Sequence, residues 1–353
     1  MNLGKKIENK GKKILIKLIL KLLPINSANE KFSSKKIKKV IIVRIDERLG
    51  NLIFINPVIN SFLKAKKDVT LVIPKKFSEL FLLNKNFHKC KIIYFEKKKL
   101  FNPLNFLSLI FKLRKEEFDL LFDATNPNNL SSLALFVMLI IKARYKVGFK
   151  RKNSEHLLNI IINRPEGRVH ILKYYKLLFN AIKIKFYPDL KFEIPSKYKN
   201  KLNKLKKEFK NYYLLGVHPG GRGLKQFPPE KLKIVILKIL KRFKNIKILL
   251  FIGPNEKNTI SLFKNIERVE IIIPSNIIEL AIYMKLLNIY IGNDSGPIHL
   301  AEGFNLKLIG IYKPDAAIVF KPTVSKYKMI ITPSPYTLNP EILYKSFLRI
   351  YKK

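Results

Sequence analysis

A loop in the second half of the chain combines glycines, cations and a helix start, which is a combination that binds phosphate groups. Residues 218–225 read His-Pro-Gly-Gly-Arg-Gly-Leu-Lys, and Pro228 and Pro229 follow, as is common in the first turn of a helix. Glycines let backbone amides turn toward an anion, the helix start adds a positive dipole end, and Lys225 adds a point charge. Gly-Gly loops before helices are common, so this loop alone is a weak signal.

Residues 292–299, which read Gly-Asn-Asp-Ser-Gly-Pro-Ile-His, give the strongest local signal. The pattern predicts a strand, a tight turn at Asp294 and a helix that places Ser295 and His299 four residues apart on one face. The free amides near Ser295 and Gly296, the serine hydroxyl and the imidazole would together bind an anion. The alternative is a Ser or Asp helix cap and a half-buried histidine without a ligand.

Glu256 follows another expected strand, in the sequence Gly-Pro-Asn-Glu at 253–256. A carboxylate at the mouth of a sheet can accept hydrogen bonds from the vicinal hydroxyls of a ribose. The alternative is a glutamate that only complements the dipole at a helix start. Because three strand ends of one half carry matching groups, we expect a site for a nucleotide diphosphate there.

Carboxylates follow two expected strands of the first half. Asp46 and Glu47 come after the strand at 40–45, and Asp123 comes after the strand at 118–122. A carboxylate at a strand mouth that faces a cleft is a candidate general base. The alternative is ordinary loop solvation, with Asp46 paired to Arg44 or Arg48.

The elements that position these residues alternate along the chain. Strands are expected at 40–45, 69–73, 91–95, 118–122, 213–217, 247–252, 269–273, 288–291 and 306–312. Helices are expected near 57–66, 75–83, 102–115, 128–142, 228–243, 256–265, 276–287 and 296–304. Such alternation predicts parallel sheets with helices on both faces.

The pattern breaks at 193–196, Glu-Ile-Pro-Ser, and passes into a lysine-rich connector that is expected to be helical. We therefore expect two doubly wound, Rossmann-like α/β domains in tandem, over 38–195 and 196–353. In such sheets ligands bind outside the carboxyl ends of the strands, where the residues above are expected.

The charge balance is strongly basic. The 353 residues include 70 Lys and Arg against 25 Asp and Glu, a formal net charge of +45. That excess favours an anionic partner, such as nucleic acid, an anionic membrane or a phosphorylated substrate. No nucleic-acid recognition module is visible and the cations are scattered, so we expect no nucleic-acid partner.

Residues 1–25 predict a basic amphipathic helix. Lys17 and Lys21 lie four residues apart and share one face, opposite a wide apolar face. This pattern is typical of a helix in the plane of an anionic bilayer, so we expect residues 1–24 to contact an anionic membrane surface. The alternative is a helix packed on its own domain. No stretch is long and apolar enough to predict a spanning helix, and Cys90, the single cysteine, excludes a disulfide within the chain.

In its motifs the sequence resembles glycosyltransferase family 9, the ADP-heptose:lipopolysaccharide heptosyltransferases. The resemblance runs in order over roughly residues 38 to 315. The matching segments are Val-Ile-Ile-Val-Arg-Ile-Asp at 40–46 with Gly50 and Pro57; Phe-Asp-Leu-Leu-Phe-Asp at 118–123; Lys-Val-Gly-Phe at 146–149; His-Pro-Gly at 218–220 with Lys225 and 228–230; 251–256; and 292–301.

The resemblance implies a GT-B fold, with the acceptor held by the N-terminal domain and the sugar nucleotide by the C-terminal domain. It implies inverting, metal-independent transfer of a sugar, a heptose, from an ADP-sugar to a lipopolysaccharide core or related anionic glycolipid, with no cofactor. Such an enzyme would act in the cytoplasm, peripherally at the inner face of the inner membrane. By the family's pattern Lys225 contacts the diphosphate, Glu256 the ribose, and Asp294, Ser295, Gly296 and His299 the phosphates or the sugar.

The sequence departs from the family at one position. The family's first motif usually ends in Gly-Asp, and that Asp looks like the general base, whereas this chain has Gly50 and Asn51. A neutral amide has no basic site, so Asn51 cannot accept the proton. We expect Asp46, then Glu47, to act as the base, with Asp123 as the other candidate for that role; Asn51 and Asp123 are otherwise expected as contacts to acceptor or sugar. The alternative is a degenerate GT-B protein that binds nucleotide sugar or glycolipid without catalysis.

Overall fold

A parallel sheet forms the centre of the N-terminal half of the chain. The computed structural model describes residues 32–97, 99, 102–151, 154, 157–221 and 226–352. Within these ranges the first sheet has the order β3-β2-β1-β4-β5-β6, with every neighbouring pair parallel. Its strands are β1 (Lys39–Val43), β2 (Asp68–Pro74), β3 (Lys91–Phe95), β4 (Phe118–Asp123), β5 (Ala143–Phe149) and β6 (Ile160–Ile162).

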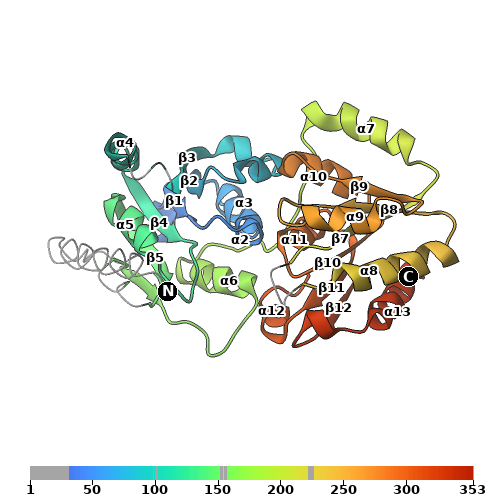
Figure 1. Ribbon diagram of the computed structural model, residues 1–353. Helices are drawn as coiled ribbons and strands as arrows, with labels where there is room; N and C mark the ends of the chain where they lie inside the picture. Colours follow the sequence, from blue (N-terminus) through green and yellow to red (C-terminus); the bar gives the residue numbers. More distant parts are fainter. Residues whose placement is uncertain are drawn as a thin grey trace.

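Helices cover both faces of this sheet (Figure 1). One face carries α4 (Pro103–Arg114) and α5 (Ser132–Ile140), and the other carries α2 (Leu49–Ile53), α3 (Asn56–Lys64) and α6 (Ile171–Ala181). Proline in the first turn of α3 and α4 supports the expected helix starts. The segment expected as a helix at 75–83 contains a 3₁₀ helix, Ser78–Leu83, in place of an α-helix.

The C-terminal half repeats this architecture. Its sheet has the order β12-β11-β10-β7-β8-β9, again with parallel neighbours throughout the described residues. The strands are β7 (Tyr213–His218), β8 (Ile246–Phe251), β9 (Val269–Ile272), β10 (Ile289–Asn293), β11 (Lys307–Tyr312) and β12 (Tyr327–Ile331). In each sheet the strand order reverses beside its first strand, which is where ligands bind in such folds.

The helices of this half are α7 to α13. They are α7 (Lys199–Glu208), α8 (Pro229–Arg242), α9 (Ile260–Phe263), α10 (Ile277–Met284), α11 (Gly296–Gly303), α12 (Pro314–Val319) and α13 (Pro340–Tyr351). Helices α8, α9 and α13 pack on one face of the sheet, and α10 and α11 lie on the side of the N-terminal half (Figure 1). No helix within the described ranges is both long and apolar enough to cross a membrane.

The two halves share one apolar core. The buried side chains of α2, α3 and α6 form a single cluster with those of α10 and α11. The connector between the halves is hydrogen-bonded to both of them. The amide of Phe192 donates to the carbonyl oxygen of Gly303 at 2.8 Å, and the amide of Glu193 donates to the carbonyl oxygen of Leu83 at 2.9 Å. The two sheets therefore face each other across a packed interface.

The expected doubly wound α/β fold is confirmed, with every expected strand present within a few residues of its expected ends. The structure also contains β5, β6, β12, α2, α6, α12 and α13, which the sequence pattern did not predict. The helix expected over 1–25 lies outside the described residues. The boundary expected at 195 and 196 falls between β6 and β7 and remains a prediction.

Candidate active site

A cavity of about 580 Å³ lies between the two halves. The C-terminal half lines it at the carboxyl ends of β7, β8 and β9, and the N-terminal half lines it with α2 and with the turn after β2. Its lining includes Leu49, Lys75, Phe77, Ser78, His218, Phe251, Gly253, Glu256, Ser275, Asn276, Ile277, Leu280 and Pro297. Two of the three strand ends singled out in the sequence thus meet in one cavity, and Pro297 of α11 borders it.

Glu256 sits at the base of this cavity on the turn after β8. Glu256 is buried, and its carboxylate fills the space beside two glycines. A Cβ on Gly253 would lie 2.5 Å from Oε2 of Glu256, and a Cβ on Gly220 would lie 3.0 Å from Oε1. Burial raises the pKa of the carboxyl, while backbone hydrogen bonds from Gly253 and Glu256 lower it. The glycines after β7 and β8 are therefore needed for the close approach of this carboxylate, which can accept hydrogen bonds from ligand hydroxyls.

His218 lies beside Glu256 at the end of β7. Desolvation lowers the pKa of its ring to about 4, so the imidazole is neutral at pH 7. Its Nδ1 has no hydrogen-bond partner among the described residues. A Cβ on Gly220 would lie 2.2 Å from the ring, so glycine is required there as well. His218 stands in the motif noted in the sequence, but sequence reasoning gave it no role.

The start of α11 presents a free hydroxyl. Ser295 is the N-cap residue, yet its side chain makes no capping hydrogen bond. Its Oγ is buried and has no partner among the described residues. A buried polar atom without a partner is costly, and a ligand oxygen would satisfy it. The alternative in which this serine is only a helix cap does not fit the geometry.

His299 lies on the same helix, one turn further on, and is buried between two carboxylates. Its Nε2 lies 3.7 Å from Oδ1 of Asp294, and its Nδ1 lies 3.4 Å from Oε2 of Glu302. Burial lowers the pKa of the ring, but the hydrogen bonds and charges of Asp294 and Glu302 outweigh it and raise the pKa to about 9. His299 is therefore a cation at pH 7, beside the start of α11.

The N-terminal half contacts α11 directly. A Cβ on Gly50 would lie 3.3 Å from Cδ2 of His299, and a Cβ on Gly296 would lie 2.8 Å from the side chain of Leu49. Phe54 also packs on His299, with ring centroids 4.9 Å apart. Helix α2, which directly follows the loop of the candidate bases, is thus held against the helix that carries the candidate anion site.

Asp46 is held by three groups within this loop. Arg44 pairs with its Oδ2 at 2.6 Å, and its Oδ1 accepts from the amide of Arg48 at 3.2 Å and from Nδ2 of Asn51 at 3.0 Å. The pairing with Arg44 that the sequence left open is therefore present. A carboxylate oxygen has two lone pairs, so Oδ2 can still accept a proton. Glu47, the second candidate base, is exposed to solvent.

Comparison with known proteins agrees with this arrangement. Residues 106–342 match the family described as glycosyltransferase family 9 (heptosyltransferase). The chain belongs to glycosyltransferase family 9. This glycosyltransferase is 24% identical over 311 residues to lipopolysaccharide heptosyltransferase 1 of Campylobacter coli, a match that covers 82% of the chain and 88% of the relative.

Solved structures of the family share the fold of this glycosyltransferase. A family 9 glycosyl transferase from Veillonella parvula superposes with a TM-score of 0.74 at 16% identity, over 89% of this chain and 97% of that one. The E. coli heptosyltransferase WaaC with ADP superposes with a TM-score of 0.70 at 14% identity, over 88% of this chain and 99% of that one. The expected GT-B fold is thereby confirmed.

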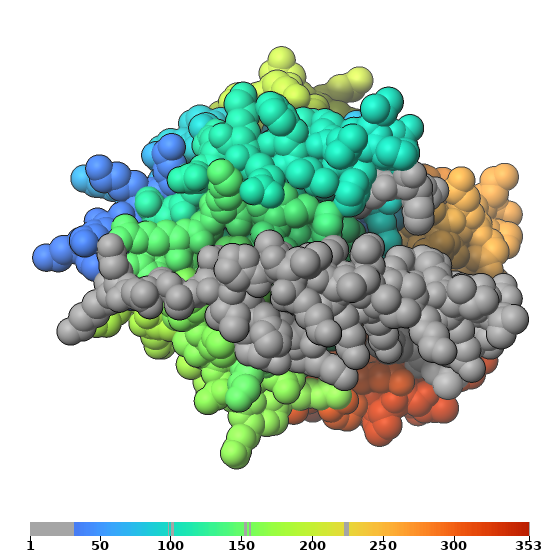
Figure 2. All heavy atoms as spheres, turned by 90° about the vertical axis from the view of Figure 1, so that its left-hand side faces the viewer, coloured from blue at the N-terminus to red at the C-terminus, as the bar shows by residue number. Residues whose placement is uncertain are grey.

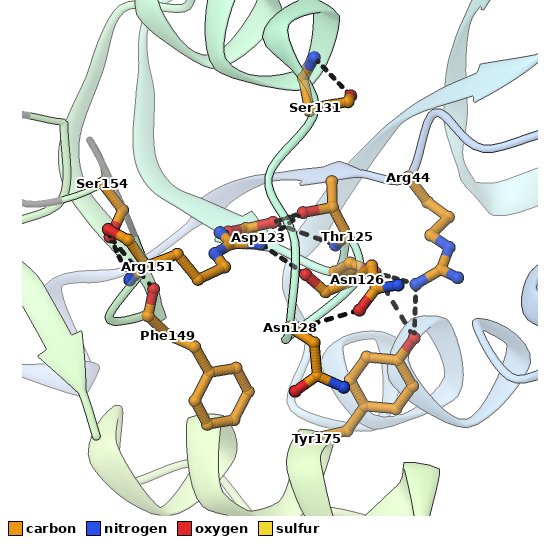
Figure 3. A network of polar contacts seen from close by, with 12 residues as sticks. Arg44, Asp123, Thr125, Asn126, Asn128, Ser131, Phe149, Arg151, Ser154 and Tyr175 are labelled. Atoms are coloured by element: carbon orange, nitrogen blue, oxygen red, sulfur yellow. Dashed lines mark hydrogen bonds and ion pairs between the residues drawn. The ribbon is translucent and has the colours of Figure 1, made fainter. Parts of the chain in front are cut away.

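Asp123 of the glycosyltransferase lies in a buried network in the N-terminal half (Figure 3). Arg151 pairs with its Oδ2, and Thr125 donates to its Oδ1 from both its amide, at 3.0 Å, and its hydroxyl, at 2.6 Å. Gly148 makes room for this carboxylate, because a Cβ there would lie 2.9 Å from Oδ2. The expected contact of Asp123 with acceptor or sugar remains a prediction; in the structure the carboxylate supports the loop that follows β4.

That loop in turn supports Arg44. Arg151 also donates to the carbonyl of Asn126 at 2.8 Å, and the guanidinium of Arg44 donates to the carbonyl of Ala124 (Figure 3). Because Arg44 pairs with Asp46, a chain of polar contacts runs from Arg151 to the candidate base.

Asn293 is a site residue that sequence reasoning did not assign. Its Nδ2 donates to the carbonyl of Gly220 at 2.7 Å, and its Oδ1 accepts from the amide of Phe227 at 3.2 Å. The end of β10 thus holds both ends of the loop after β7.

Residues 222–225 of that loop, including Lys225, lie outside the described residues, so the contact of Lys225 with a diphosphate remains a prediction. Among the described residues no three of His, Cys, Asp and Glu are grouped to hold a metal ion.

Proposed function

We propose that this glycosyltransferase moves a heptose from ADP-heptose to a hydroxyl of a lipopolysaccharide core or related anionic glycolipid, with inversion and without a metal ion or other cofactor. Support comes from two relatives, the lipopolysaccharide heptosyltransferase 1 of Campylobacter coli and the E. coli heptosyltransferase WaaC, which was solved with ADP. The cavity supports the donor class, because it combines a buried carboxylate with the start of a helix.

One observation carries the diphosphate part of this proposal. The unpartnered hydroxyl of Ser295 and the cationic ring of His299 both belong to the start of α11, whose Pro297 borders the cavity. Helix amides, a hydroxyl donor and a cation are the groups that bind a diphosphate. Lys225, on the loop held by Asn293, would add a further positive charge.

The nucleoside would occupy the remainder of the cavity. Glu256 would accept hydrogen bonds from the ribose hydroxyls, because its buried carboxylate faces the space between β7 and β8. Phe251, Ile277 and Leu280 supply an apolar surface for the base. A base and a ribose placed in this way leave the diphosphate at the start of α11.

Transfer then follows from these positions. The acceptor hydroxyl attacks the anomeric carbon of the sugar from the side opposite to the diphosphate, so that a new C–O bond forms while the bond to the diphosphate breaks. The hydroxyl proton passes to Asp46, a step that contributes typically about 10²–10⁴-fold. His299 and the amides of α11 stabilise the negative charge that develops on the departing diphosphate.

Calorimetry with the full chain tests the donor site. We expect ADP and ADP-heptose to bind and UDP to bind at least about tenfold more weakly, and Glu256→Gln and Ser295→Ala each to weaken ADP binding. Ser334→Ala, a change outside the cavity, serves as the control. Unchanged ADP affinity in both site variants would refute the donor site.

Turnover tests the reaction itself. Release of ADP from ADP-heptose in the presence of a heptose-deficient lipopolysaccharide would support the transfer. Donor binding without turnover across a panel of glycolipid acceptors would favour the alternative, a GT-B protein that binds without catalysis, which Asn51 at the place of the family's Asp motivates.

We further propose that the enzyme acts peripherally at the cytoplasmic face of the inner membrane, with residues 1–24 on an anionic membrane surface. The lysines and the apolar face of this segment support that placement. Removal of residues 1–24 should reduce co-sedimentation with anionic liposomes. Unchanged co-sedimentation would mean that the segment does not contact the bilayer.

A further inference from the structure

Helix α4 presents apolar side chains on two opposite faces. Leu109 and Leu113 are buried against the sheet, and Phe106 stacks on Phe136 of α5 with ring centroids 5.1 Å apart. This inner face is enough to hold the helix on the domain. The outer face is also apolar, and packing among the described residues leaves it exposed.

Three large side chains form that outer face. Leu104 is 77% exposed, Leu107 59% and Phe111 70%. Positions i, i+3 and i+7 fall on one side of a helix, so these side chains form a continuous stripe. Single exposed apolar residues are ordinary on a protein surface, but a contiguous stripe marks an interaction site.

Cations flank the two ends of the stripe. Lys97, Lys99, Lys112, Arg114 and Lys115 are exposed at the two ends of α4. The nearby carboxylates are already paired: Glu96 with Lys75 and Lys99, Glu116 with Lys91, and Glu117 with Lys142. The surface around the apolar stripe is therefore positively charged.

We infer that α4 is an interfacial helix that inserts Leu104, Leu107 and Phe111 into an anionic lipid bilayer. An apolar stripe flanked by Lys and Arg matches the boundary between acyl chains and anionic headgroups, where the basic side chains reach the headgroups while the stripe is buried. Negative charge on the lipid surface attracts each of the flanking cations.

The positive charge around the stripe also favours an anionic bilayer over two other partners for this face, a second copy of this chain and residues 1–24. A second copy of this chain would bring a second basic rim against the first, and residues 1–24 carry lysines at 5, 6, 10, 12, 13, 17 and 21. Both would add like charge around the stripe, whereas an anionic bilayer neutralises it.

The position of α4 suits a membrane-bound enzyme. It lies on the outer side of the N-terminal half, at the end of the molecule away from the C-terminal sheet (Figure 1), and in Figure 2 its atoms lie at the surface of that side. Docking through α4 leaves the C-terminal half, which carries most of the cavity lining, away from the bilayer and open to a water-soluble nucleotide.

A single tryptophan can report this contact, because the chain contains none. We propose Phe111→Trp as the reporter and Ile234→Trp, on α8 of the other half, as the matched control, since Ile234 is also an exposed apolar residue, 47% exposed. Vesicles of phosphatidylcholine and phosphatidylglycerol should shift the emission of Phe111→Trp to shorter wavelength and allow quenching by brominated acyl chains. Phosphatidylcholine alone should act much more weakly, and the control should not respond.

Loss of binding provides the second measurement. The triple variant with Leu104→Asn, Leu107→Asn and Phe111→Asn should lower partitioning into anionic vesicles by about tenfold or more. The variant with Ile234→Asn and Leu237→Asn should partition like the wild type. Affinity for ADP should be unchanged in both, which separates this inference from the proposed function: vesicle binding does not require the donor site.

Three results would overturn the inference. Emission of Phe111→Trp that is already at short wavelength without lipid, and that moves to longer wavelength on dilution, would show a second copy on α4. If the emission of Phe111→Trp is at short wavelength without lipid and moves to longer wavelength when residues 1–24 are removed, that segment covers α4. Wild-type partitioning of the triple variant would show that another surface binds the bilayer.

Discussion

The side-chain amide of Asn51 donates to Oδ1 of Asp46 at 3.0 Å. The two positions that the family pattern and the sequence offer for a base are therefore in direct contact. In this chain the amide orients the carboxylate, and Arg44 holds the other oxygen at 2.6 Å. The geometry fits a division in which Asn51 positions the proton acceptor and Asp46 is that acceptor.

Asn51→Asp tests this division. The change places a second carboxylate within hydrogen-bond distance of Asp46, and two such groups titrate as a pair with one pKa raised. The acid limb of the pH profile of kcat/KM should therefore move to higher pH. Rates measured from pH 5 to 9 check this, with donor affinity as the control for folding.

Asp46→Asn should lower kcat by about 10²–10⁴-fold while donor affinity stays at the wild-type value. Glu47→Gln is the matched control and should change kcat by much less. If Glu47→Gln loses turnover and Asp46→Asn retains it, Glu47 is the base.

Glu302 should set the charge of His299. Its Oε2 lies 3.4 Å from Nδ1 of the ring, and its Oε1 accepts from the amide and hydroxyl of Thr323. The pKa of the His299 ring is raised from 6.5 to about 9, so the ring is fully protonated at pH 6.5 and below. It loses its positive charge as pH rises through about 9. Glu302→Gln should thus move the loss of ADP affinity to lower pH.

Thr323→Val is the control for this experiment. It removes the hydroxyl at 2.6 Å from Oε1 but leaves the charge of Glu302 in place, so the loss of affinity should shift much less. Calorimetry with ADP between pH 6 and 10 measures both variants. A Glu302→Gln profile identical to that of the wild type would contradict the role of Glu302.

The sequence predicted the candidate site where the signal was local. Glycine, proline and charged residues after β7, β8 and β10 are near one another in the chain, so the turn, helix start and ligand type could be inferred from composition. The alternation of strands and helices likewise predicted two Rossmann-like domains, because each element carries its own pattern.

The rest of the site depends on contacts between distant segments. Asn293 and Gly220 are 73 residues apart, and the contact between Gly50 and His299 joins the two halves. Nothing in the pattern around Asn293 indicates which loop it holds. Likewise β6 has only three residues, too few for a periodicity to be recognised.

His218 predicts a dependence of stability on acid. Because the pKa of its ring is lowered from 6.5 to about 4, the unfolded chain takes up a proton between these values and the native protein does not. Stability should therefore decline as pH falls from about 6.5 to about 4, by roughly 3 kcal/mol for this group. Urea unfolding gives the free energy of unfolding of the wild type and of His218→Gln at each pH. The difference between the two pH dependences isolates the contribution of His218, because the titration of the carboxyl groups is common to both proteins.

Arg151→Met should destabilise the N-terminal half. It leaves the buried carboxylate of Asp123 without its ion-pair partner, and breaking a buried pair in this way costs about 3–5 kcal/mol. Denaturant unfolding measures the loss. The double variant Asp123→Asn with Arg151→Met should recover part of it, because no unpaired charge remains; a double variant as unstable as the single one would mean that packing, and not the charge, dominates.

Gly296→Ala tests the contact between the two halves. A Cβ at this position would lie 2.8 Å from the side chain of Leu49, closer than carbon atoms approach without displacement, so α2 must move away from α11. That movement shifts the loop carrying Asp46 relative to the start of α11, and a misplacement of about 1 Å can cost on the order of 10²-fold in rate. We expect kcat to fall more than donor affinity. Leu49→Gly in the same chain removes every side-chain atom of Leu49 that the new Cβ would meet, so the double variant should regain much of the lost rate. A double variant as slow as Gly296→Ala alone would show that the glycine acts on α11 itself rather than through the contact with Leu49.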